Sequence, residues 1–297
     1  SLGVSTNRDE WVFEDDEQLL SKKMQYFISI YNKSIECNHI NYSIKWSSSL
    51  ISKFKNKEKS EYFPRFVISL IYRPYITKYY YSNKFFSDRL TSNHYQVFGN
   101  ELINSNQVIM FSGVGSSKQN SVLVTNNIFC LDTLEKTQCL PLYYYEKEGN
   151  RIDNITDWGL QQFQKHYNDK TITKLDIFHY TYAVLHYPEY RSKYELNLKR
   201  EFPRLPFYDN FSQWVEWGSK LMELHINYET VAPYPLTRID TNNNLKPKTK
   251  LKADREKNSI NLDDITFLQD IPKMVRMTKE IVDAVGLPVT VKTRLGW

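Results

Sequence analysis

Hydrophobic and polar positions follow different rhythms along this chain, and the first rhythm is helical. Within residues 17–31, apolar side chains recur at steps of three and four, which places them on one face of a helix. These apolar side chains are Leu19, Leu20, Met24, Phe27, Ile28 and Tyr31. The pattern predicts an amphipathic helix, and residues 47–57 predict a second, basic helix.

The second rhythm, between about residues 62 and 145, is typical of β-strands. Short runs rich in Val, Ile, Tyr and Phe are separated by clusters of Asn, Ser, Gly and Pro, which favour turns. These runs cover residues 66–72, 79–81, 107–111, 121–124 and 141–145. This part of the chain is therefore expected to form a compact, strand-rich core.

After Asn154 the helical pattern returns. Asp157 is suited to cap the first of these helices, because a short side-chain oxygen can accept from the free backbone amides of a first turn. Helices are expected over residues 158–167, 175–185, 188–202 and 211–228. The half of the chain that follows the strand-rich core is thus predicted to be helical.

The C-terminal part changes character twice more. Residues 236–258 are polar and mostly basic, which predicts an exposed loop or hairpin, and residues 272–297 predict a helix, a stop and a β-branched strand. The fold class expected is α+β, with a strand-rich core, a helical subdomain and a helix–strand tail. The predicted boundaries are 1–60 for an entry segment with helices, 61–150 for the core, 151–235 for the helical subdomain, 236–265 for the loop or hairpin and 266–297 for the tail.

The composition is that of a folded protein, with 41% hydrophobic and 25% charged residues. Only 9 of the 297 residues are Gly, which disfavours a glycine-rich nucleotide-binding loop. No apolar run approaches the roughly 18 residues that a membrane-spanning helix needs, and the start lacks a signal-peptide pattern. The chain also lacks an initiator Met. We therefore expect a cytoplasmic protein without a membrane partner, cut from a longer polypeptide.

No complete catalytic or metal-binding motif stands in the sequence. A Walker loop, GxSxG, HExxH and the Asn- or Asp-Pro-Pro-aromatic loop of amino methyltransferases are all missing. The three cysteines are an odd number without a CxxC spacing, which supports neither a disulfide framework nor a zinc site. His179 and His186 share a helix face, but without a third ligand nearby they are more typical of packed side chains. No catalytic residue, cofactor or metal is predicted for this chain.

A glycine cluster in residues 108–121 is a candidate anion site. Two Gly, the neighbouring Ser116 and Ser117, and Lys118 follow a predicted strand, and such a loop can point amides and one cation at a phosphate. The other interpretation is a turn that connects two strands. No helical pattern follows to supply an N-terminal dipole, which favours the turn.

Basic residues interleaved with aromatic ones give a collective signal for nucleic acid. The formal net charge is +5, and positive charge attracts phosphates without regard to sequence. Because many basic residues merely solvate a surface, charge leaves both interpretations open. The candidate contacts to phosphates or bases are Arg73, Lys78, Lys84, Arg89 and Lys118.

Seven ordered blocks carry a resemblance to a known family. They are residues 3–12, 72–75, 112–118 with Thr125, 138–145, 177–191, 202–207 and 218–225. In this order they resemble the C-terminal target-recognition, or specificity, region of the type ISP restriction-modification enzymes. Those enzymes combine nuclease, ATPase translocase, adenine methyltransferase and recognition parts in one chain.

The resemblance implies a non-enzymatic module that recognises double-stranded DNA. It would read bases in the major groove and present a target adenine to an upstream methyltransferase domain that this chain lacks. S-adenosylmethionine, ATP and Mg would belong to the complete enzyme. Residues 7–9 look like the strand that leaves the methyltransferase and are expected to belong to that neighbour. Arg73 lies in a shared block and would grip phosphate or hold the fold, whereas base readers are expected between blocks, in residues 92–106 or 125–138.

The end of the chain departs from this family. Beyond about residue 265, residues 268–297 are similar to a helix–strand unit of the flavin-dependent tRNA-dihydrouridine synthases, with Lys292 and Arg294 at the matching positions. About 30 residues cannot close an eight-stranded barrel, and the catalytic Cys of that family has no counterpart in the tail. A fusion or chimeric junction near residues 265–272 is therefore expected rather than a flavoenzyme. An interaction scaffold for neighbouring domains is the remaining alternative.

Overall fold

The computed structural model describes residues 2–117, 120–232, 235, 237–239, 252–254 and 259–261, and divides the chain into two compact units, Ser1–Val231 and Ala232–Trp297. In the second unit the described residues form a three-stranded sheet in the order β10-β11-β9. Its strands are β9 (Thr237–Ile239), β10 (Lys252–Asp254) and β11 (Ser259–Asn261). The predicted tail, with Lys292 and Arg294, lies outside the described residues.

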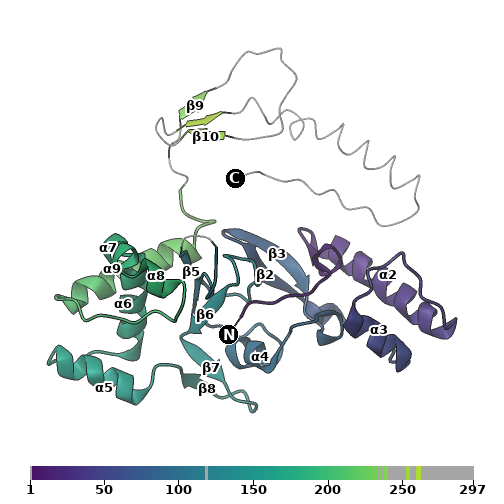
Figure 1. The fold of residues 1–297 in the computed structure, drawn as a ribbon, viewed down its shortest axis with the longest axis horizontal. Coiled ribbons are helices and arrows are strands. Elements are labelled where there is room, and N and C mark those ends of the chain that lie inside the picture. Colours follow the sequence, from purple (N-terminus) through teal and green to yellow (C-terminus); the bar gives the residue numbers. More distant parts are fainter. Residues whose placement is uncertain are drawn as a thin grey trace. The chain divides into compact units, whose positions relative to one another are not determined.

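The first unit combines helices with small antiparallel sheets, so the α+β fold class is confirmed (Figure 1). Its helices are α1 (Asp9–Val12), α2 (Glu17–Glu36), α3 (Ser48–Lys55), α4 (Ser92–Phe98), α5 (Asp157–His166), α6 (Lys174–His186), α7 (Pro188–Lys193), α8 (Glu195–Leu198) and α9 (Phe211–Ile226), with 3-10 turns η1 (Pro64–Phe66) and η2 (Lys84–Phe86). Its strands are β1 (Phe13–Glu14), β2 (Val67–Arg73), β3 (Ile76–Tyr81), β4 (Val108–Phe111), β5 (Val122–Thr125), β6 (Gln138–Pro141), β7 (Tyr143–Tyr145) and β8 (Arg151–Asp153).

Three sheets organise the strands of this unit. The first has the order β1-β3-β2, the second β5-β4-β6, and the third pairs β7 with β8, all antiparallel. The first two sheets meet where Ile71 of β2 forms a bridge with Phe129, between β5 and β6. Thr133 strengthens this junction, because its hydroxyl donates to the carbonyl of Ile71 at 2.9 Å.

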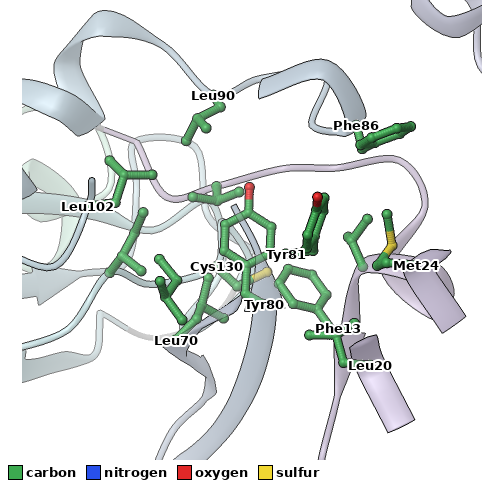
Figure 2. Close-up of a cluster of buried hydrophobic side chains, with 14 of the residues drawn as sticks. Phe13, Leu20, Met24, Leu70, Tyr80, Tyr81, Phe86, Leu90, Leu102 and Cys130 are labelled. Atoms are coloured by element: carbon green, nitrogen blue, oxygen red, sulfur yellow. The ribbon is translucent and has the colours of Figure 1, made fainter. Parts of the chain in front are cut away.

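The first hydrophobic core lies between α2 and the β1-β3-β2 sheet. The side chain of Asp16 accepts from the amide of Leu19 and caps α2, and the apolar face that the sequence predicts is turned inward. Leu20, Met24 and Phe27 are completely buried. Figure 2 shows Leu20 and Met24 with other buried side chains of this core: Phe13, Leu70, Tyr80, Tyr81, Phe86, Leu90, Leu102 and Cys130.

The second core is formed by α6 and α9 with the sheet strands β4 and β5. The Thr173 and Asp176 side chains form a capping box that starts α6. Gly218 of α9 faces α6 so closely that a Cβ there would lie 1.9 Å from the carbonyl oxygen of His179. Glycine is therefore required at this position for the two helices to approach each other.

The structure corrects two details of the helical half. The single helix expected over residues 188–202 is two short helices, α7 and α8, because the chain leaves helical geometry at Tyr194, whose φ is −109° and ψ 19°. The N-cap of α5 is Thr156 rather than Asp157, since the Thr156 hydroxyl accepts from the amide of Gly159 at 3.1 Å.

The entry segment also differs from expectation. Residues 7–9 were expected to belong to a missing neighbour, yet they are built into this unit: Arg8 and Val4 are completely buried. Val4 forms a bridge with Cys130, and its amide donates to the carbonyl of Phe129 at 2.9 Å. Asp9 begins the helix α1. The segment thus completes the edge of the first core, because its apolar and backbone groups find their partners there.

Candidate nucleic-acid interface

Two of the candidate cations flank one aromatic ring on the β2–β3 hairpin. The guanidinium carbon of Arg73 lies 4.0 Å from the ring centre of Tyr72, and Nη1 donates to the Tyr72 carbonyl at 2.7 Å. The ammonium of Lys78 lies 5.2 Å from the same ring centre and 3.0 Å from the Asp15 carboxylate. Among the described residues Arg73 has no carboxylate partner, so of the two it keeps its positive charge uncompensated.

Lys84 begins η2 and Arg89 follows it, and both side chains are exposed. Lys53 of α3 joins them: its ammonium donates to the carbonyl of Phe85 at 2.6 Å and lies 4.2 Å from the centre of that ring. Burial, followed by the charges of Arg8 and Lys84, lowers the pKa of Lys53. This gathering of cations between α3 and η2 was only hinted at in the sequence by the basic character of residues 47–57.

Between these cations lies a buried polar network that sequence reasoning missed. Nη2 of Arg8 contacts Asp88 at 3.2 Å and also donates to Ser47, and Asn7 donates to Asp88 at 2.8 Å. Burial alone would raise the pKa of Asp88, but hydrogen bonds from Ser49 and Asn7 and the charge of Arg8 lower it. Asp88 therefore points inward as a structural anion, which holds the entry segment against α3.

The glycine-rich loop already holds a carboxylate of this chain. The hydroxyls of Ser116 and Ser117 donate to Glu135 at 2.6 and 3.0 Å. Gly113 is placed by a close backbone approach, because a Cβ there would lie 2.0 Å from the carbonyl oxygen of Lys136. These contacts fit the strand-connecting turn, and a phosphate could take this position only by displacing Glu135. Lys118 lies outside the described residues.

The two segments in which base readers were expected differ in exposure. In residues 125–138 most side chains are buried or half-buried, and those that are exposed are Asn126, Asn127, Asp132 and Lys136. In residues 92–106 the helix α4 and the loop after it expose a row of polar side chains: Ser92, Asn93, Gln96, Asn100, Glu101 and Ser105. Both segments thus offer groups that can form hydrogen bonds to base edges, and in residues 125–138 Asn126 and Asn127 lie together in the turn that follows β5.

The histidines do not assemble a metal site. The rings of His186 and His225 lie 5.5 Å apart and pack with Tyr182. Burial, with the charges of His225 and Arg191, lowers the pKa of His186 to about 4. In the part of the chain that the structure describes, no group of three His, Cys, Asp or Glu side chains is arranged to hold a metal, and no helix is long and apolar enough to cross a bilayer.

Several solved structures are similar to this chain, and three of them are parts of larger proteins solved with DNA. The DrdV–DNA complex matches with 40% sequence identity and a TM-score of 0.79, over 86% of this chain and 27% of that one. LlaGI, a Type ISP restriction-modification enzyme in complex with a DNA substrate mimic, matches with 28% identity and a TM-score of 0.67, over 80% and 22%. LlaBIII, an ATP-dependent Type ISP enzyme bound to DNA, matches at 22% identity and a TM-score of 0.68, over 80% and 16%, and shows the fold alone.

This chain therefore spans about a quarter, or less, of the length of the proteins it resembles. A search of curated proteins finds no match. The sequence matches one described family over residues 1–276, which extends past the junction expected near residues 265–272. The resemblance found in the sequence is thus confirmed, and this chain belongs to the family of Type ISP C-terminal specificity domains.

Proposed function

We propose that this chain recognises a short sequence in double-stranded DNA for a restriction-modification enzyme. The observation that carries the proposal is its likeness, at 40% identity over 86% of its length, to a protein solved as a DNA complex. The uncompensated Arg73 and the exposed Lys84 and Arg89 supply charge for phosphates. Exposed carboxamides in the two candidate reading segments supply donors and acceptors for base edges.

The division of labour belongs to the same proposal. The chain positions a target adenine, and a methyltransferase domain of the parent polypeptide modifies it at N6. S-adenosylmethionine, ATP and Mg serve that larger enzyme, whereas this module works without a catalytic step of its own. We place the protein in the cytoplasm, where it meets DNA.

The experiment is fluorescence anisotropy of the purified chain with a random-sequence duplex pool and a matched single strand, at two salt concentrations. Because binding to phosphates releases counterions, the logarithm of the affinity for duplex should fall linearly with the logarithm of salt concentration. Selection of the bound duplexes should then enrich one short adenine-containing site. Equal affinity for every duplex at every salt concentration would contradict the proposal.

A second candidate function, a scaffold for neighbouring domains, has one observation in its favour. Trp158 of α5 is 70% exposed, and Trp217 and Leu224 of α9 are 51% and 47% exposed. Trp217 and Leu224 are seven positions apart on α9 and share a helix face, and contiguous exposed apolar patches are typical of protein interfaces. If Trp217→Gln abolishes association with the upstream part of the parent polypeptide while neutralising Lys84 and Arg89 leaves the enzyme active, the scaffold describes the chain better.

A further inference from the structure

A cavity of about 290 Å³ opens where the two hydrophobic cores meet. One wall is formed by the β2–β3 hairpin, including Thr77, and a second by the end of β5 with Asn126 and Asn127. The residues that follow α9 close the third side, with Tyr228 among them. The hydroxyls of Thr77 and Tyr228 lie 3.2 Å apart and join the first wall to the third.

The lining is almost entirely neutral and able to form hydrogen bonds. Among the described residues that line the cavity, none is Lys or Arg, and Glu229 is the one acidic side chain. The Glu229 carboxylate accepts from the hydroxyl of Tyr228 at 2.9 Å. A phosphate or another anion is therefore disfavoured here, in contrast to the exposed cations elsewhere on the same unit.

His225 presents a neutral ring to this cavity. Burial lowers the pKa of His225, so the imidazole is uncharged at neutral pH. Its Nδ1 lies 2.6 Å from the hydroxyl oxygen of Tyr182, and the backbone of Val124 forms a hydrogen bond with the same hydroxyl. The other ring nitrogen, Nε2, is a donor or an acceptor according to the tautomer of the ring.

The two asparagines are held in place but keep their side chains available. Oγ1 of Thr125 accepts from the amide of Asn127 at 3.0 Å, which fixes the turn that follows β5. Both asparagines are exposed, and in the described part of the chain neither carboxamide has a hydrogen-bond partner. Each offers a donor and an acceptor side by side, which is the pattern that pairs with the edge of adenine.

A hollow of this kind does not read an intact duplex, because the base edges of a duplex lie at the floor of a groove and cannot enter a concave surface. A base that has left the helix can enter it, and the volume is near the lower limit for small-ligand pockets, which suits one planar group. The Glu229 carboxylate is an acceptor for an exocyclic amino group. We propose that this cavity binds a single unpaired nucleobase with an exocyclic amino group, adenine or cytosine. The proposal rests on the proposed DNA recognition and names the form of DNA that this site takes.

The test compares the affinities of the full chain for matched duplexes that differ at one unpaired position. The duplexes carry a bulged adenine, cytosine or thymine, a bulged abasic site, or no bulge. We expect the adenine and cytosine bulges to bind on the order of tenfold more tightly than the abasic bulge, since a few buried hydrogen bonds are gained. The double variant Asn126→Ala/Asn127→Ala should lose this preference, so that it binds the adenine, cytosine and abasic bulges with equal affinity.

Gln161→Ala/Gln162→Ala is the matched control, because it removes two neighbouring exposed carboxamides of α5, which do not line the cavity. It should leave the preference intact, and circular dichroism melts should coincide for all three proteins. If the chain binds every duplex in a salt-dependent way without distinguishing an unpaired base from an abasic site, the cavity proposal is overturned and the proposed function stands. If it binds no duplex at low salt, the proposed function itself fails.

Discussion

The two ends of β5 are built from similar polar residues and have opposite properties. Before the strand, Ser116 and Ser117 direct their hydroxyls at the carboxylate of Glu135. After the strand, Asn126 and Asn127 leave their carboxamides exposed beside a neutral cavity. A cluster of hydrogen-bonding residues therefore marks a binding site only where other groups of the chain do not already occupy those donors and acceptors.

The largest predicted effect is a loss of folding stability on acidification, and the group responsible is His186 of α6. Burial lowers the pKa of His186 from its ordinary 6.5 to about 4. Between these values the unfolded chain holds a proton that the folded chain does not, so stability is lost as the pH falls from 6.5 to 4. The loss should reach about 3 kcal/mol, measured by urea unfolding across this pH range.

The variant His186→Met identifies the group responsible. Nε2 of His186 is buried and has no hydrogen-bond partner among the described residues, so an apolar side chain of similar length should be tolerated. The pH dependence of unfolding should become shallower by most of the predicted loss. An unchanged slope would assign the acid sensitivity to another group.

The second largest effect is expected at Gly113, in the loop that precedes β5. Gly113→Ala places a methyl group 2.0 Å from the carbonyl oxygen of Lys136, and backbone on both sides leaves little room to yield. The free energy of unfolding should fall by about 2 kcal/mol, as for other overpacked sites, and thermal unfolding monitored by circular dichroism measures this. Gly149→Ala is the control for replacing a glycine without close packing, because nothing lies within 4 Å of its added Cβ. Its effect comes from backbone strain alone, since its φ is +88°. Equal effects of the two variants would contradict close packing at Gly113.

A smaller effect is expected for Glu135→Gln, which removes the charge that Ser116 and Ser117 contact. Ser116 and Ser117 lose a charged hydrogen-bond acceptor, so the free energy of unfolding should fall by about 1 kcal/mol. The loss is no larger because Ser117 is exposed and can bond to water instead. Affinity for duplex DNA should change less than about twofold, since removal of one distant charge is screened by salt. A rise of about tenfold in the anisotropy assay would show instead that this loop takes a phosphate once its own carboxylate is neutralised.

Features that depend on neighbouring residues could be predicted from the sequence, whereas contacts between residues far apart along the chain could not. The amphipathic face of α2 was predictable because its period is local, and Leu20, Met24 and Phe27 are buried as expected. The burial of Arg8 was not, because its partner Asp88 is 80 residues away along the chain. The use of Ser116 by Glu135 is likewise a contact between distant positions, which no local pattern contains.

The smallest predicted effect concerns DNA affinity, to which Arg73 of the β2–β3 hairpin should contribute more than Lys78. Arg73 and Lys78 flank the ring of Tyr72, but within the described part of the chain only Lys78 has a carboxylate partner, Asp15, at 3.0 Å. Arg73→Gln should reduce the slope of log affinity against log salt by about 1 and weaken duplex binding a few fold, if the guanidinium meets a phosphate. Lys78→Gln should change the slope by less, because Asp15 already compensates the charge of Lys78. This variant also leaves the exposed Asp15 carboxylate unpaired. Anisotropy titrations over several salt concentrations separate the two variants, and a larger slope change for Lys78→Gln would mean that Asp15 does not shield it in the complex.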